Sequence, residues 1–556
     1  MLYHILEFLK KINRKFILLI IIFLAGSFEL LGLSLVYPII YLLFDVNSVQ
    51  EIDNIYLKVV LDFFNYDKKL IIFAIVLIII LKFIFLFIYN SYHRIVSFNF
   101  QNKLREEYFE SIFKSKYAQN LGNSSAILNS LTNQTKNAQS ALTILFKIIQ
   151  ILFITISLFF LGLLVSKELF FCSLILELIV FFIFRWVINN SKRISKKLID
   201  YEDKYLNIVN QSNSNYKYIK ISETNSFMLE KIKNILNKIK NENLKFIYLK
   251  NLTTLSNEPI LLIILISIFY IGLNILDLNI STLLTTLIIL YRFNSQIFPI
   301  FGLYQSFRFD FQSYIHIENE LINLKKNIEL NKGLNLKKIN SIKFNKAIFG
   351  HNKILFQVNN LFLKKNKLIT LKGVSGSGKS TFVDTLLGIN KLIDGKILIN
   401  DKDHNKINIK SLRKVIGYLG QDNALFNDTI INNINLRSLK INKKKLKEMI
   451  KDLDLVKIFK NESIDLQFVI KESKENISGG ERQRLAFIRE IMHDPELLII
   501  DEAFNSLDKD TLKKIKNFII KLKHKMIIIN IAHHEELTDI SDNIYKIKSR
   551  KLIKIK

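Results

Sequence analysis

The chain has 556 residues, 49% of them hydrophobic, and its 79 Lys and Arg against 49 Asp and Glu give a net charge of +30. This length predicts at least two domains, and the apolar content excludes a disordered basic tail. The single cysteine excludes a disulfide scaffold and a thiolate metal site. A chain that is both apolar and basic is typical of an integral membrane protein with basic cytosolic regions. It contains no recognisable nucleic-acid-binding module, so no nucleic-acid partner is expected.

Six long apolar stretches within residues 1–335 predict six transmembrane helices. The stretches are 16–44, 70–92, 148–166, 169–184, 259–276 and 278–307. Each is close to or above the roughly 20 residues that a helix needs to cross about 30 Å of hydrocarbon. Helices buried in a soluble protein are the alternative, but six such stretches in one half of a chain argue against it.

The distribution of Lys and Arg predicts that both termini are cytosolic. Cations cluster at positions 10–15, before span one, and the segments after spans two and four are long and basic, whereas the outer loops are short. We expect an interfacial helix without a cleavable signal over 1–15 and an all-α, six-span domain with long cytosolic helical extensions over 16–307. A linker over 308–335 and an α/β domain over 336–556 follow.

The α/β domain contains a glycine-rich sequence that predicts a phosphate-binding loop. Residues 373–380 fit the pattern G-x-x-x-x-G-K-[ST], between a strand-like stretch at 368–371 and a helical one at 381–387. In such a loop the backbone amides wrap a phosphate, Lys379 reaches the β and γ oxygens, and Ser380 ligates Mg²⁺. A chance glycine-rich turn is the alternative. The candidate nucleotide-binding residues are Gly373, Val374, Ser375, Gly376, Ser377, Gly378, Lys379, Ser380 and Thr381.

Two further motifs bear on the same chemistry. The apolar strand 497–500 ends in Asp501, which can hold Mg²⁺, and Glu502, which can polarise a water for in-line attack. An ordinary strand end is the alternative. The run 478–480, Ser-Gly-Gly, precedes a predicted helix at 485–492 and predicts an anion site at the helix N-terminus. A plain N-cap by Ser478 is compatible with that interpretation.

In this order, the three motifs resemble the nucleotide-binding domain of ATP-binding cassette (ABC) transporters, and the six-span half resembles the membrane domain of ABC exporters. Ser478, Gly479 and Gly480 are similar to the family's signature sequence, with Ile477 and Glu481 replacing the usual Leu and Gln. The resemblance covers the whole chain and assigns four further roles. They are adenine stacking for Phe349, with Phe344 as the competing aromatic, Mg²⁺ binding and catalysis for Gln421, the D-loop for Asp508, and the catalytic switch for His533.

The resemblance implies a homodimer that binds ATP and Mg²⁺ at two composite sites, each built from the phosphate loop of one protomer and the signature of the other. It implies coupling segments near Tyr117–Ser124 and Asn215–Asn225. It also implies a multi-pass protein of the bacterial inner membrane with its ATPase domain in the cytoplasm.

A finer resemblance, to bacterial lipid-linked oligosaccharide flippases of the PglK type, bears on the identity of the substrate. It rests on the stretches 28–38, 52–64 and 290–292. Lys82 and Arg292 are cations within spans, which are costly unless they face a cavity or a partner, so they are candidate ligands for an anionic headgroup. Pairing with an acid, Glu29 or Glu177, or snorkelling to the interface is the alternative. Export of a peptide or drug-like amphiphile, and an ATP-gated channel or regulatory protein, stay open as other functions. Cys172 lies within span four, which argues against an exporter with a cysteine protease domain.

Overall fold

The computed structural model describes residues 8, 15–35, 38–40, 42, 55–117, 124–275, 280–329, 331–350, 353–421, 424–437, 441–459, 463–471, 477–504, 507–532 and 537–556. The chain divides into two compact units. The first comprises Met1–Ser115 and Gln119–Ile328, and the second comprises Lys116–Ala118 and Glu329–Lys556.

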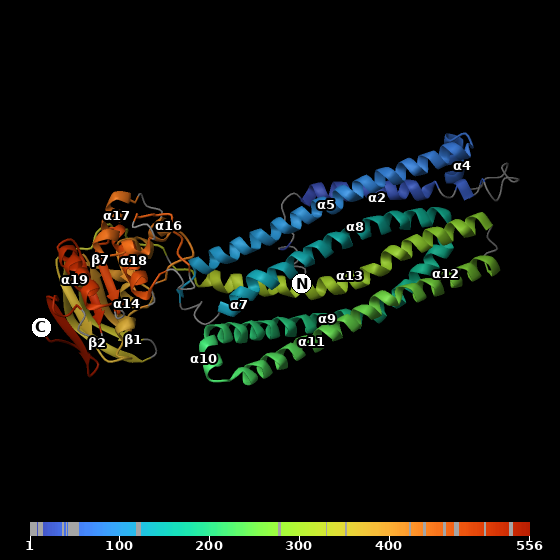
Figure 1. Ribbon diagram of the computed structural model, residues 1–556. Helices are drawn as coiled ribbons and strands as arrows, with labels where there is room; N and C mark the ends of the chain where they lie inside the picture. Colours follow the sequence, from blue (N-terminus) through green and yellow to red (C-terminus); the bar gives the residue numbers. More distant parts are fainter. Residues whose placement is uncertain are drawn as a thin grey trace. The chain divides into compact units, whose positions relative to one another are not determined.

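The first unit is built from long helices that lie side by side along most of their length (Figure 1). The described helices of this unit, short ones included, are α2 (Lys15–Ser34), α4 (Ile55–Phe63), α5 (Lys68–Lys114), α7 (Ser124–Asn129), α8 (Thr135–Val165), α9 (Lys167–Ser214), α10 (Tyr216–Ile221), α11 (Asn225–Leu255), α12 (Asn257–Asn274) and α13 (Ile280–Lys326). A one-turn π-helix, η2 (Ser130–Gln134), joins α7 to α8. In the described part of the chain, four helical stretches are long and apolar enough to cross a membrane, and a shorter one covers Phe16–Phe28. The four are Lys68–Lys114, Ser124–Val165, Asn225–Asn274 and Leu283–Lys326.

Several of these helices are much longer than a bilayer is thick. Helix α5 has 47 residues and α9 has 48, which correspond to about 70 Å at 1.5 Å per residue. Their polar ends must therefore continue outside the hydrocarbon. The long cytosolic helical extensions expected after spans two and four correspond to the later parts of α5 and α9 and to the helices α10 and α11.

Helix α13 continues well beyond its apolar stretch. It runs to Lys326, so the first part of the stretch 308–335, expected to be a linker, is helical. The reason is packing: apolar residues recur every three or four positions there and are buried against the other helices. These residues are Phe311, Tyr314, Ile317, Leu321 and Leu324.

The carboxylate of one residue in α13 connects three elements of this inner region by hydrogen bonds. Glu320 of α13 accepts a hydrogen bond from the Tyr108 hydroxyl of α5 at 2.8 Å and from the Ser130 hydroxyl of η2 at 2.6 Å. A chain of polar contacts also links Gln305 of α13 to Ser191 of α9 at 2.9 Å and to Thr253 of α11 at 2.8 Å. Because all of these groups are buried or partly buried, the contacts fix how the helices pack.

The second unit contains a ten-stranded sheet in the order β5-β4-β1-β2-β10-β9-β3-β8-β7-β6. The strands are β1 (Ser341–Gly350), β2 (Ile354–Lys364), β3 (Leu368–Lys372), β4 (Asp394–Ile399), β5 (Lys402–Asp403), β6 (Ile416–Leu419), β7 (Leu497–Asp501), β8 (Ile527–Ala532), β9 (Asn543–Lys548) and β10 (Lys551–Lys554). Strands β9, β3, β8, β7 and β6 run parallel, whereas β1, β2, β4 and β5 pair antiparallel. All six residues of β8 are buried, as expected for a central parallel strand covered on both faces.

Helices cover the parallel part of the sheet (Figure 1). They are α14 (Lys379–Leu386), α15 (Ile409–Lys414), α16 (Ile430–Ile434), α17 (Lys443–Asp452), α18 (Gly479–Met492) and α19 (Lys509–Lys523). The loop after β3, the end of β7 and the loop after β6 all leave the carboxyl edge of the sheet, which is where ligands bind in α/β proteins. The predicted fold class, a helical membrane domain followed by an α/β domain, is confirmed.

Candidate nucleotide-binding site

The loop between β3 and α14 has the backbone geometry of a phosphate cradle. Gly376 and Gly378 have φ of +76° and +103°, a region that side chains with a Cβ rarely enter. A Cβ at Gly378 would also lie 2.8 Å from Cδ1 of Phe356. The Ser377 amide donates to the Val374 carbonyl at 3.1 Å and closes the turn. The loop therefore requires glycine at these two positions.

Lys379 begins helix α14 and folds back over this loop. Its Nζ donates to the carbonyl oxygens of Gly373 at 2.8 Å and Val374 at 3.3 Å. Burial lowers the pKa of the ammonium group, and the neighbouring carboxylates of Glu502 and Asp501 oppose that shift. Carbonyl groups of the loop itself thus hold the cation.

The residues of the loop fit a phosphate group. The Ser377 hydroxyl oxygen is buried and has no hydrogen-bond partner among the residues that the structure describes. A Cβ placed at Gly376 would meet no atom within 4 Å, so the space above the loop is open. Ser380, the candidate Mg²⁺ ligand, is exposed at the start of α14. A buried hydroxyl, a cation and a helix N-terminus in one loop are the features that suit an ATP phosphate.

The acidic pair after β7 lies next to the loop. Glu502 places its carboxylate oxygen Oε1 4.0 Å from Nζ of Lys379. Its backbone is left-handed, with φ of +53°, and its amide donates to the Ile531 carbonyl of β8 at 3.1 Å. Asp501 accepts a hydrogen bond from the Tyr418 hydroxyl at 3.4 Å. Burial, and then the charge of Glu502, raise the pKa of Asp501.

Gln421 follows β6, the neighbour of β7, and its side chain is exposed. It therefore lies at the same edge of the sheet as Asp501. Tyr418, on β6 itself, is a site residue that sequence reasoning missed. Its position in the strand just before Gln421 could have indicated that it lies near the site. Its hydrogen bond to Asp501, however, depends on the pairing of β6 with β7.

Ser478 is the N-cap of α18 and forms a capping box with Glu481. The Glu481 amide donates to the Ser478 hydroxyl at 3.3 Å, and the Ser478 amide donates to the Glu481 carboxylate at 2.6 Å. The N-cap interpretation therefore holds. A Cβ at Gly479 would meet no atom within 4 Å, so the face beside this helix end is open to a ligand or to another protein surface. Gly480, the next residue, lies against Leu507.

Two predicted ligand residues have other roles in the structure. Phe349 is completely buried, and its ring stacks on Phe356 at 4.7 Å between centroids with an interplanar angle of 3°. Phe344 and Phe382 pack against the same ring, so its faces are not available to adenine. Asp508 is the N-cap of α19 and accepts a hydrogen bond from the Thr511 amide at 2.9 Å, which lowers the pKa of its carboxyl.

The remaining candidates divide into two groups. His533 lies outside the described residues. Lys82 on α5 and Arg292 on α13 are both half-buried, and neither is without a partner.

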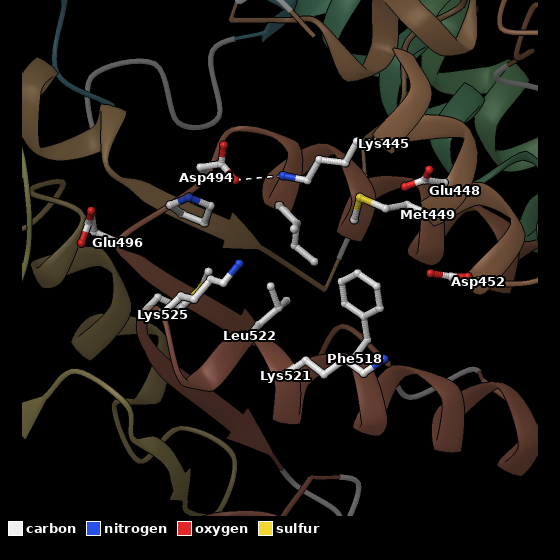
Figure 2. Close-up of a pocket in the computed structure, with 13 residues that line it drawn as sticks. Lys445, Glu448, Met449, Asp452, Asp494, Glu496, Phe518, Lys521, Leu522 and Lys525 are labelled. Atoms are coloured by element: carbon white, nitrogen blue, oxygen red, sulfur yellow. Dashed lines mark hydrogen bonds and ion pairs between the residues drawn. The ribbon is translucent and has the colours of Figure 1, made fainter. Parts of the chain in front are cut away.

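A hollow of about 540 Å³ lies between α17, α18 and α19 (Figure 2). Lys445 and Asp494 form an ion pair at 3.0 Å on its wall, and Met449 and Phe518 line its floor. The hollow lies near the residues that precede β7 and β8, whereas the phosphate loop and Asp501 are at the carboxyl ends of the parallel strands. It contains none of the predicted site residues.

Comparison with known families agrees with this geometry. Residues 15–296 match the ABC transporter transmembrane region, and residues 356–505 match the ATP-binding module described as ABC transporter. The chain therefore belongs to the ABC transporters, and it has the domain content of an exporter half-transporter. The predictions of a multi-pass membrane protein, of an ATP-binding domain and of a transport ATPase class are confirmed at the level of the family.

Several relatives share part of the sequence. A putative export ATP-binding/permease protein of Rickettsia typhi is 35% identical over 38% of this chain and 38% of its own length. The mitochondrial iron-sulfur clusters transporter ATM1 of Debaryomyces hansenii is 34% identical over 36% of this chain and 29% of its own length. The lactococcin-G-processing and transport ATP-binding protein LagD of Lactococcus lactis is 35% identical over 41% of this chain and 31% of its own length. The matches thus span about a third of these relatives.

The overall fold is shared with a solved exporter. The structure of a bacterial Atm1-family ABC exporter with ATP bound superposes with a TM-score of 0.80 over 96% of this chain and 94% of that one. The sequence identity is 19%, so the likeness concerns the fold.

Proposed function

We propose that this chain is one subunit of a homodimeric exporter of the bacterial inner membrane that couples ATP hydrolysis to the movement of an amphipathic substrate. The observation that carries the ATPase part is the 4.0 Å approach of the Glu502 carboxylate to the Lys379 ammonium, beside a loop with the geometry of a phosphate cradle. The family assignment supports the transport part.

Each side chain of the site has a role that follows from its position. Bound MgATP supplies the phosphoanhydride bond whose hydrolysis releases the free energy for transport. Lys379 and the loop amides hold the phosphates, and Ser380, Asp501 and Gln421 would hold the Mg²⁺. Glu502 orients the attacking water and accepts its proton, because it is the carboxylate that projects beyond the end of β7 toward the loop.

The signature sequence acts on the ATP of a second copy in this proposal. The open face beside Gly479, at a helix N-terminus whose cap is already satisfied by Ser478 and Glu481, supports this assignment. In this arrangement, backbone amides and the positive end of α18 would bind an anion that the other protomer holds.

Helix α10 supports the proposed coupling segment at 215–225. This six-residue helix exposes Tyr216, Tyr218 and Ile221 by 65%, 70% and 72%. Three large apolar side chains on one short cytosolic helix are typical of a contact surface. The other proposed segment, 117–124, lies largely outside the described residues.

We propose a lipid-linked saccharide as the first substrate to test. Arg292 lies on α13 two positions before the completely buried Asn294, whose Oδ1 has no hydrogen-bond partner in the described part of the chain. The Ser295 hydroxyl donates to the Arg292 carbonyl at 2.8 Å. A polar stretch with a guanidinium inside a span suits an anionic, polar headgroup. The segment 52–64, part of the resemblance to flippases, contains helix α4.

A peptide is the second candidate, because LagD, a lactococcin-G-processing and transport protein, is among the relatives. The test is reconstitution in proteoliposomes with labelled lipid-linked saccharides, amphipathic peptides and dyes. Accumulation that requires ATP and is lost in Glu502→Gln supports an exporter, and the class that accumulates names the substrate. Flux that only follows the gradient indicates a channel and contradicts the proposal.

Arg292→Ala then separates the substrate proposal from the ATPase proposal. If Arg292 binds the headgroup, this variant loses transport and substrate-stimulated hydrolysis but keeps basal hydrolysis and assembly. Arg292→Lys should retain part of the transport, because a point charge replaces the planar guanidinium. Full transport by a well-folded Arg292→Ala protein rejects the role of this residue.

A further inference from the structure

One face of α9 changes from apolar to cationic along its length. Exposed apolar side chains recur every three or four residues through the predicted fourth span and end at Trp186, which is 65% exposed. The apolar residues are Phe171, Ile175, Leu178 and Phe182. The same spacing continues with Asn190, Arg193 and Lys197. The helix therefore presents lipid-like surface, then an aromatic ring, then two cations on one stripe.

The neighbouring antiparallel helices show the same order. Along α12 and α11, an exposed apolar stripe ends at Tyr248, which is 65% exposed, and Lys245 follows one turn further. The apolar residues are Tyr270, Ile266, Leu262, Leu255 and Leu252. Helices α9 and α11 lie side by side (Figure 1). The two stripes thus reach their aromatic and cationic ends at the same level.

These ends line a single groove of about 400 Å³. Its walls include Trp186, Arg193 and Lys197 from α9, and Lys245 and Tyr248 from α11. Its one carboxylate, Glu242, is already paired with Lys245 at 2.7 Å. Within the described part of the chain, Arg193 and Lys197 have no ion-pair partner. The groove therefore carries an excess of positive charge that the protein leaves unneutralised.

We infer that this groove binds the phosphate headgroup of an anionic phospholipid from the cytosolic leaflet. Tryptophan and tyrosine prefer the level of the headgroups, and basic grooves between transmembrane helices on the cytosolic side take acidic headgroups. The acyl chains would lie along the exposed apolar stripe of α9 above Trp186. The lipid is a ligand in addition to any transported substrate, and its binding does not depend on ATP hydrolysis.

The chain offers a direct probe, because Trp186 is its single tryptophan. The wild-type protein is reconstituted in nanodiscs of phosphatidylcholine with a fixed minor fraction of phosphatidylglycerol, and one or the other lipid is brominated. Brominated phosphatidylglycerol should quench Trp186 several-fold more strongly, per mole of brominated lipid, than brominated phosphatidylcholine. Equal quenching by the two lipids overturns the headgroup site. Quenching by neither shows that another protein surface, such as a second copy of this chain, covers the groove, and this also overturns the proposal.

The variant Arg193→Gln/Lys197→Gln tests the cations. The preference for phosphatidylglycerol should fall about fivefold for each cation removed. The matched control is Lys204→Gln/Lys233→Gln, which removes two exposed cations from α9 and α11 at positions outside the groove. The control should keep the wild-type preference, and both variants should keep basal ATPase activity. An unchanged preference in Arg193→Gln/Lys197→Gln, or an equal loss in the control, rejects a specific headgroup site in favour of general surface charge.

Discussion

The Glu502 carboxylate and the Lys379 ammonium lie 4.0 Å apart although their strands are not neighbours. Lys379 follows β3 and Glu502 follows β7, and β8 lies between these two strands. The left-handed backbone of Glu502 and the bond of its amide to Ile531, in β8, turn the side chain across the edge of the sheet. The position of the proposed base therefore depends on three strands at once.

The first prediction concerns Glu502 itself. Glu502→Gln keeps the size of the side chain but removes the carboxylate that accepts a proton from water. We expect MgATP binding to be retained and the rate of hydrolysis to fall by a factor of about 10² to 10⁴. Single-turnover hydrolysis and equilibrium nucleotide binding on the same preparation measure the two effects. Near-normal hydrolysis would show that another group is the base.

The second prediction concerns the composite site. Lys379→Ala should lose nucleotide affinity, whereas Ser478→Arg should block hydrolysis without preventing binding to one ATP domain. In a mixed dimer of the two variants, one site carries both lesions and the other carries neither. Mixing inactive variants should therefore restore part of the ATPase activity. Absence of recovery in dimers shown to be mixed would contradict the exchange of signature sequences.

The third prediction uses Phe349, which packs inside an aromatic cluster. Phe349→Ala leaves a cavity against Phe356 and Phe382 and should destabilise the ATP-binding domain by about 3–5 kcal/mol. Phe362→Ala is the control, because that ring is 44% exposed on the neighbouring strand. Thermal unfolding reports stability, and titration with ATP reports affinity of the folded fraction. A strong loss of affinity at unchanged stability would restore the adenine-stacking role.

The fourth prediction is a pH dependence of stability through His404. Burial lowers the pKa of this imidazole below its ordinary 6.5, and the ring bonds to the Leu386 carbonyl at 3.2 Å. The pKa of His404 is lower in the folded state than in the unfolded state. The contribution of its neutral ring to the free energy of unfolding is therefore complete above pH 6.5 and is lost as the pH falls through the folded-state pKa. Thermal unfolding temperatures between pH 7.5 and 5 should therefore fall less steeply for His404→Gln than for the wild type. Identical slopes for His404→Gln and the wild type would contradict the assignment.

The sequence alone determined the fold class, the family and the phosphate loop. These features depend on local chemistry: a spacing of glycines before Lys379, an apolar strand before Asp501, and stretches long enough to span a bilayer. In each case a short run of residues carries the whole signal, so no knowledge of distant contacts is needed.

Only the tertiary structure decided what Phe349 contacts, where α13 ends and which residue supports Asp501. Phe349 and Phe356 face each other because β1 and β2 pair in that register, and Tyr418 reaches Asp501 because β6 pairs with β7. The groove at Trp186 likewise forms only where α9 meets α11. These outcomes depend on pairings between segments far apart in the chain. The free energy of such a contact depends on both partners, so the sequence of neither segment predicts the contact by itself.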